Sequence, residues 1–321
     1  MKSKLLCVVL CASVFFSCEK GNVESEIPEK PSVEKPDEPE KPSKIPSTDN
    51  IFNFNNKFMI IGTTDWASIT YGNGRYVVVG YGGYVTSSTD GIVWETPKII
   101  PRSDFNWVSV TFGNGKFVAI DSYSTCNVMT STDGINWTQV GKVIDNNNYD
   151  IYSVSFCNGL FIAVGEGLIY TSSNGTSWTR RMSQSYVRAP YAVAYGNSKF
   201  VAVGYYGFAW AANDGFSWTE NKTGIISNLN DIVFSNGKFV AVGSSGYIIT
   251  SLDGITWTSP KQVGARPWLG IAYCNGKFLV VGDDGYITTS IDGENWTTPE
   301  QIKDESGKVI TANLNGVCAM P

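Results

Sequence analysis

The chain has 321 residues, of which 42% are hydrophobic and 17% are charged, with a formal net charge of -5. It contains no histidine, which excludes Ser-His-Asp and Cys-His catalysis and histidine-ligated metal centres. A charge this small and acidic gives no electrostatic basis for binding nucleic acid.

The N-terminus has the pattern of a secretory leader. Lys2 and Lys4 precede an apolar run at 5–17, which is too short to span a bilayer but typical of a signal-peptide core. The run ends at Cys18, and residues 14–18 (VFFSC) resemble a bacterial lipobox of the Bacteroides type, with Phe15 in the usual Leu position. The resemblance implies that 1–18 is a lipoprotein signal peptide, that Cys18 is lipidated, and that the protein is a surface-exposed lipoprotein of the bacterial outer membrane. The alternative is an ordinary signal peptide cleaved nearby.

Residues 19–50 have the composition of a tether. They contain nine acidic residues, five lysines and six prolines, with almost no large apolar side chain. Such a segment cannot bury enough surface to offset the entropy of ordering it. We expect a disordered, extended and semi-stiff linker.

A repeat dominates the rest of the chain. Six runs share the pattern Thr-Ser-x-Asp-Gly-x-x-Trp or a close variant, and their tryptophans are Trp94, Trp137, Trp178, Trp218, Trp257 and Trp296. The spacing of about 40 residues is the period of one four-stranded propeller blade.

Each repeat predicts four strands, as residues 268–299 illustrate. The first strand covers 269–273 and an Asn-Gly turn leads into the second, at 277–281. A Gly-x-x-Gly segment leads to the third strand, and Asp-Gly to the fourth. Asn-Gly and Asp-Gly favour two-residue hairpin turns, so both turns are expected to be tight. The second strand is apolar without alternation, which indicates burial on both faces.

The repeated motif resembles the Asp-box, or BNR, repeat of sialidase-type propellers and, more distantly, the sortilin and photosystem-assembly-factor propellers. The resemblance implies that the Ser and Asp side chains bind backbone amides of the turn while the Trp packs beneath it. On this interpretation the motif is structural, and cutting a buried Trp such as Trp257 to Ala should cost about 3–5 kcal/mol. The Asp-to-Trp spacing here is one residue shorter than usual, and Asn174 and Ala212 replace the Asp and the Ser in two repeats.

The two ends of the domain complement each other. Residues 314–319 are similar to a first strand and 56–62 to a second strand of the repeat. We therefore predict that 51–321 is an all-β propeller of six four-stranded blades plus a two-stranded composite seventh that closes the ring. The alternative is a six-bladed ring with this strand pair as a plug.

Candidate ligand contacts come from positions that vary between repeats. The first strand begins with a tryptophan in three repeats, the loops after the second strand carry tyrosines and acids, and three arginines precede a first strand. The candidates are Trp66, Trp107, Trp268, Tyr81, Tyr123, Tyr205, Tyr206, Asp283, Asp284, Arg102, Arg188 and Arg266. Aromatic faces with interspersed charges suit a sugar ring or a peptide. The alternative is that the tryptophans only seal neighbouring blades.

Three classes of function remain. The first is a non-catalytic, lipid-anchored binding module for a glycan or protein ligand. The second is a sialidase-like glycoside hydrolase, which the arginines suggest although the Phe-Arg-Ile-Pro segment and a Tyr-Glu pair of that family are missing. The third is a structural scaffold in an envelope complex. No metal or cofactor is expected; the protein is expected to be a monomer that touches the membrane only through its anchor.

Overall fold

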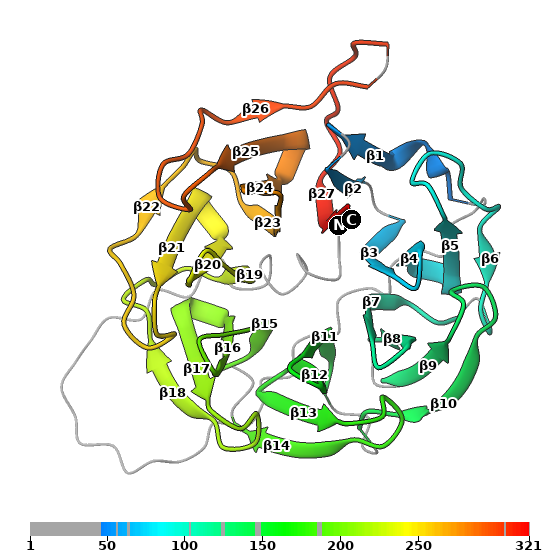
Figure 1. Cartoon of the computed structure of the whole chain (residues 1–321), viewed down its shortest axis with the longest axis horizontal. Helices are drawn as coiled ribbons and strands as arrows, with labels where there is room; N and C mark the ends of the chain where they lie inside the picture. The colour runs from blue at the N-terminus through cyan, green and yellow to red at the C-terminus, as the bar shows by residue number, and fades with distance from the viewer. Residues whose placement is uncertain are drawn as a thin grey trace, which may run out of the picture.

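The computed structural model describes residues 46–55, 57–62, 65–102, 104–122, 126–144, 149–184, 188–304 and 306–320. These residues form seven sheets arranged radially around one axis, so the chain is a β-propeller (Figure 1). The predicted leader with Cys18, most of the predicted tether and Tyr123 lie outside the described residues.

Six of the described sheets have four antiparallel strands, which run outwards from the axis in chain order. Their bounds are β3 Trp66–Gly72, β4 Arg75–Gly80, β5 Tyr84–Ser88 and β6 Lys98–Ile99 in blade 1; β7 Trp107–Gly113, β8 Lys116–Asp121, β9 Asn127–Ser131 and β10 Thr138–Lys142 in blade 2; and β11 Ile151–Cys157, β12 Leu160–Gly165, β13 Leu168–Ser172 and β14 Thr179–Ser183 in blade 3. They continue with β15 Pro190–Gly196, β16 Lys199–Gly204, β17 Phe208–Ala212 and β18 Thr219–Lys222 in blade 4; β19 Leu229–Ser235, β20 Lys238–Gly243, β21 Tyr247–Ser251 and β22 Lys261–Gln262 in blade 5; and β23 Trp268–Cys274, β24 Lys277–Gly282, β25 Tyr286–Ser290 and β26 Glu300–Gln301 in blade 6.

The closing blade corrects the predicted fold. It has three strands, in the order β1 (Ile51–Phe54), β2 (Phe58–Gly62) and β27 (Leu314–Ala319), with β27 innermost. The prediction of a two-stranded seventh blade is wrong because Ile51 to Phe54 pair with β2 over their whole length. The six-bladed alternative is also wrong, since this sheet occupies its own sector of the ring between β23 and β3 (Figure 1).

The two kinds of turn differ from each other. The first turn is the predicted two-residue hairpin: Gly72 pairs with Arg75, and Asn73 and Gly74 between them have positive φ. The predicted tight turn at Asp-Gly is wrong. In blade 2, β9 ends at Ser131 and β10 begins at Thr138, which pairs with Thr130, so 132–137 form a longer turn before the outermost strand.

Side chains of the repeated motif organise that longer turn. In blade 6 the Ser290 hydroxyl accepts a hydrogen bond from the amide of Gly293, and Asp292 accepts from the amides of Glu294 and Asn295. These donors hold the pKa of Asp292 well below its usual range, with Asn295 as the largest contributor. The Ser and Asp positions therefore serve the backbone, as the sequence predicts.

The motif tryptophans are only half-buried, which corrects the expectation of full burial. In blade 6 the Trp296 ring lies 6.2 Å from the ring of Phe278, and the tryptophan packs at the edge of the interblade core. Because less apolar area is covered, truncation of Trp257 should cost about 1–2 kcal/mol rather than 3–5.

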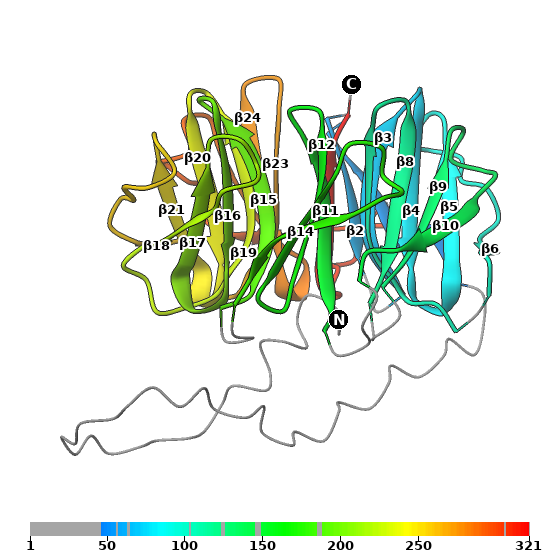
Figure 2. The same cartoon turned by 90° about the horizontal axis from the view of Figure 1, so that it is seen from below.

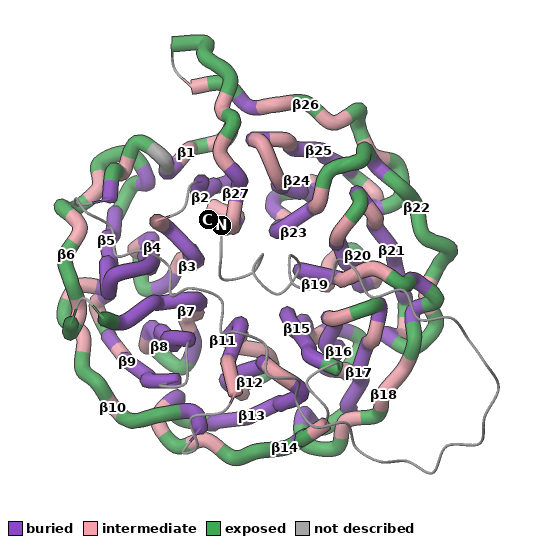
Figure 3. The backbone as a smooth tube through the Cα atoms, turned by 180° about the vertical axis from the view of Figure 1, so that it is seen from behind, coloured by how far each residue is buried: buried purple, intermediate pink, exposed green. Residues whose placement is uncertain are grey.

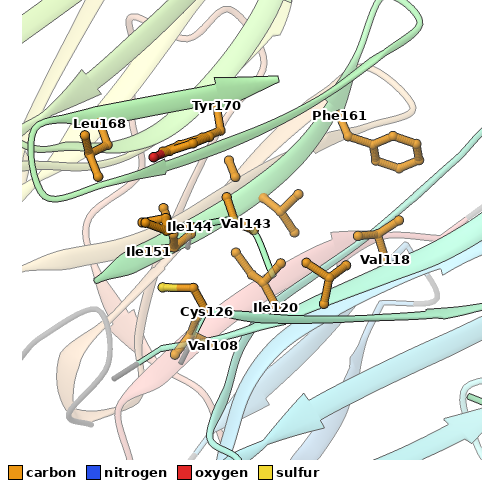
Figure 4. Packing of buried hydrophobic residues seen from close by; sticks show 13 residues of the cluster. Val108, Val118, Ile120, Cys126, Val143, Ile144, Ile151, Phe161, Leu168 and Tyr170 are labelled. Carbon is orange, nitrogen blue, oxygen red and sulfur yellow. The ribbon is translucent and has the colours of Figure 1, made fainter. Parts of the chain in front are cut away.

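The core lies between neighbouring blades. The second strand of every described blade is buried on both faces; in β8 and β12 every residue after the first is buried, drawn purple in Figure 3. Between blades 2 and 3, Val118 and Ile120 of β8 lie in one buried cluster with Phe161 and Leu168 of blade 3 (Figure 4). Each sheet thus buries its apolar faces only when two neighbours cover them.

Close approach between blades also explains one glycine. A Cβ atom at Gly113, the last residue of β7, would lie 2.1 Å from the Phe156 ring of blade 3. We expect Gly113→Ala to lower the free energy of unfolding by about 1–3 kcal/mol, because the ring must move out of a packed site. The measurement is urea unfolding followed by tryptophan fluorescence. Adding Phe156→Leu should restore part of the loss; a double variant that is less stable by the sum of both costs would contradict the clash.

Candidate ligand site on the loop face

The loops after the second strands lie on one face of the ring, opposite the tight hairpins (Figure 2). The first amide of each such loop donates to the residue that precedes the innermost strand of the same blade. Examples are Tyr205 N to Ala189 O at 2.9 Å and Asp283 N to Pro267 O at 3.1 Å. The residues fixed in this way next to the innermost strands are called the inner rim here: Tyr81, Ser122, Glu166, Tyr205, Ser244 and Asp283.

One sector of the inner rim is aromatic. Tyr205 packs against a buried cluster of Tyr152, Ala189 and Tyr191, and the rings of Tyr152 and Tyr191 meet edge to face at 5.5 Å. Tyr206 stacks on Tyr205 at 5.7 Å and is 52% exposed. The structure therefore brings two predicted residues together with two tyrosines that the sequence analysis missed. The missed signal is the second residue of the first strand, where Tyr152 and Tyr191 replace smaller side chains of other repeats.

A second sector, in blade 6, is polar and charged. Arg266 forms an ion pair with Asp284, and the amide of Asp284 donates to Asn313 Oδ1 at 3.0 Å. Burial, together with the neighbouring Asp284 charge, raises the pKa of Asp283 to about 6, while Arg266 opposes the rise. Three predicted residues, Asp283, Asp284 and Arg266, thus form one group; sequence reasoning missed Asn313.

The raised pKa makes Asp283 a cost to the fold at neutral pH. Folding favours the protonated form of the Asp283 carboxyl. The contribution of this carboxyl to the free energy of unfolding is therefore fully present below the ordinary pKa of 3.8 and is lost as the pH rises through about 6. We expect Asp283→Asn to raise the free energy of unfolding by about 1 kcal/mol at pH 7.5, after allowance for solvent screening, and by almost nothing at pH 3.5. Calorimetry at both pH values measures this. Glu166→Gln, in the same loop position of blade 3, is the control; an equal gain at pH 3.5 would contradict the prediction.

The other two predicted arginines form ion pairs with residues outside this group. Arg102 pairs with Asp104, and Arg188 pairs with Glu220 at 3.0 Å and lies over the Phe208 ring. With Arg266 on Asp284, the three arginines form separate ion pairs rather than a shared carboxylate-binding cluster. This arrangement gives no support to a sialidase-like centre.

The three predicted tryptophans are buried between blades. Trp66, Trp107 and Trp268 are at most 1% exposed, and their indole N–H groups donate to Ser47 O, Ile100 O and Val263 O at 3.0 Å. Tyr81 is also buried. As ligand contacts these four residues remain predictions, and their burial favours the alternative in which the tryptophans seal neighbouring blades.

The described part of the chain holds no group of three or more Cys, Asp or Glu residues placed to bind a metal ion. Nor does any helix within it have the length and hydropathy needed to cross a bilayer.

No protein-family model and no curated protein matches the chain. Solved structures do. YCF48 bound to D1 peptide is 18% identical with a TM-score of 0.59, and the match covers 79% of this chain and 86% of that one. YCF48 from Cyanidioschyzon merolae is 16% identical with a TM-score of 0.60, covering 78% and 88%. Virginiamycin B lyase from Staphylococcus aureus is 11% identical with a TM-score of 0.67, covering 78% and 90%. At these identities the likeness is one of fold, that of a β-propeller.

Proposed function

We propose that this propeller is a non-catalytic binding module that holds a peptide segment of another protein against the inner rim of its loop face. The aromatic sector carries the proposal. Tyr205 and Tyr206 stack beside Tyr152 and Tyr191, and the stack leaves Tyr206 half-exposed. Such aromatic groups supply contact area at a low cost in side-chain entropy, which is why they anchor protein interfaces.

Two further points support a peptide over a small substrate. The rim combines this aromatic sector with the charged group of Asp283, Asp284 and Arg266, and a peptide offers both apolar and charged side chains. A propeller of similar fold, YCF48, has been solved with a D1 peptide bound. A glycan ligand would also stack on tyrosine, so it becomes an alternative outcome of the test below.

We propose in addition that the repeat is a variant of the Asp-box family and that the module is displayed on a bacterial outer membrane by a lipid on Cys18. The described chain begins at the loop face, where Ser47 O accepts the indole N–H of Trp66. Extended at about 3 Å per residue, the predicted tether at 19–50 would let the ring stand several nanometres from the membrane. Incorporation of labelled palmitate that is lost in Cys18→Ala tests the anchor; equal labelling of the variant would contradict it.

The binding test uses the purified protein on a peptide array and a glycan array in parallel. We expect selected peptides whose affinity falls at least about tenfold in Tyr206→Ala. Phe216→Ala is the matched control, because Phe216 is an exposed aromatic residue in the turn between β17 and β18 of the same blade, and it should bind normally. Binding only to glycans, turnover of glycosides, or a stable partner retained by Tyr206→Ala would overturn the proposal.

A further inference from the structure

We propose that a sector of the loop face formed by Asn230 and Ser244 of blade 5 and Asp283 of blade 6 is a site for a cationic group, a primary ammonium or a guanidinium, presented by the bound peptide. The inference rests on the proposed function and names the chemistry of the ligand. It starts from buried polar atoms that the protein leaves without a hydrogen-bond partner.

Three acceptor atoms in this sector lack a partner. They are Asn230 Oδ1, Ser244 Oγ and Asp283 Oδ1, and each atom is buried with no hydrogen bond to the described residues. Asn230 is 3% exposed. An unpartnered buried polar atom costs about 1–3 kcal/mol, and such groups in proteins usually find a partner. Three of them in neighbouring blades therefore indicate a missing donor.

The backbone places the three residues around the start of β23. Asn230 donates through Nδ2 to Trp268 O at 2.8 Å, and the Asp283 amide donates to the preceding carbonyl, Pro267 O, at 3.1 Å. The Ser244 turn contacts β23 from blade 5. The hydrogen bond from Asn230 Nδ2 to Trp268 O also fixes the orientation of the side-chain amide. Oδ1 is therefore the atom of this amide that has no hydrogen-bond partner.

A donor that carries positive charge fits these acceptors. Asn230 Oδ1 and ionised Asp283 Oδ1 can only accept, and Ser244 Oγ can accept as well as donate. The resident cation, Arg266, is engaged by Asp284. An ammonium has three donors and a guanidinium five, without any acceptor, and either would neutralise a carboxylate that burial otherwise penalises.

A fourth atom fits a peptide carrier. Asn313 is 8% exposed, its Oδ1 accepts from the amide of Asp284, and its Nδ2 is buried without a partner. The Asn313 side chain that carries this donor is hydrogen-bonded to the residue after Asp283, and a peptide carbonyl would satisfy the donor. Lysine, arginine or a free N-terminus supplies both the cation and a nearby carbonyl.

The test titrates the protein with three tripeptides while nuclear magnetic resonance records side-chain amide and backbone shifts. The probes are acetyl-Gly-Lys-Gly-amide, its arginine analogue, and the same lysine peptide with an acetylated side chain. We expect the two cationic peptides to shift the Asn230 and Asn313 amides and the Ser244 backbone. The acetylated peptide should bind at least about tenfold more weakly, because its side chain has lost the charge.

Variants assign the effect to the site. Asp283→Asn keeps the shape of the side chain and should weaken cationic binding at least about tenfold, whereas Glu300→Gln removes one charge from the exposed outermost strand of the same blade and should not. Equal binding of the acetylated peptide, equal binding by Asp283→Asn, or a crystal structure with only ordered water on these atoms would overturn the site. If peptides selected on the array depend on Tyr206 for binding but need neither a cationic group nor Asp283, the cation site is wrong and the proposed function still holds. Cation binding through Asp283 without any peptide selected on the array would overturn the proposed function alone.

Discussion

Deleting residues 314–321 is expected to unfold the whole ring cooperatively rather than loosen one end. The deletion removes β27, the innermost strand of the closing blade, which pairs with β2 and packs against both β3 and β23. Leu314 is fully buried, and Asn315 Nδ2 donates to Trp66 O at 3.0 Å in the next blade. Without β27, blades 1 and 6 would each expose an apolar face that no neighbour covers.

The deletion is expected to remove most of the free energy of unfolding, which is typically about 5–15 kcal/mol for a domain. Hydrogen exchange should show protection lost in all the blades together, because each blade depends on two neighbours for its core. A synthetic peptide of residues 311–321 added in trans should restore part of the stability, which separates loss of the strand from damage to the expressed chain. Loss of protection confined to β1 and β2, with a melting temperature lowered by only about 2 °C, would contradict the expectation.

Much of this fold follows from periodicity. The spacing of the motif tryptophans predicts one blade per repeat, the unbroken apolar second strands predict burial on both faces, and Asn73-Gly74 predicts the hairpin that the structure has. β1 could not be predicted in the same way. Ile51 to Phe54 lie outside any repeat, directly after a segment rich in proline and charge, and only pairing with β2 makes them a strand.

The candidate site was harder to predict because of a local irregularity. The pairing of each described first strand shifts at its second residue, for example between Ile151 and Ser153. This bulge breaks the alternation of side chains, so the first residue, as in Trp66, points into the core while Tyr152 joins the rim. The sequence analysis selected the tryptophans because the first residue varies between repeats, and it passed over Tyr152 and Tyr191 at the second residue.

Trp66→Ala is expected to lower the free energy of unfolding by about 3–5 kcal/mol, the largest effect of any single substitution considered. Trp66 is 0% exposed in the core between the closing blade and blade 1, with Met59, Ile61 and Tyr84 in the same cluster. The truncation leaves a cavity where two blades meet and removes the donor of Ser47 O. Chemical unfolding followed by circular dichroism measures the loss.

The matched substitution is Trp257→Ala, which removes a half-buried motif tryptophan and should cost about 1–2 kcal/mol. Trp66→Phe separates the two contributions at the buried site, since it keeps most of the apolar volume while losing the indole N–H, and it should cost less than Trp66→Ala. Near-equal losses for Trp66→Ala and Trp257→Ala would show that depth of burial does not set the cost. A stable Trp66→Ala variant that no longer binds its peptide would instead make Trp66 a ligand contact, because a side chain that only seals the blades cannot be removed without loss of stability.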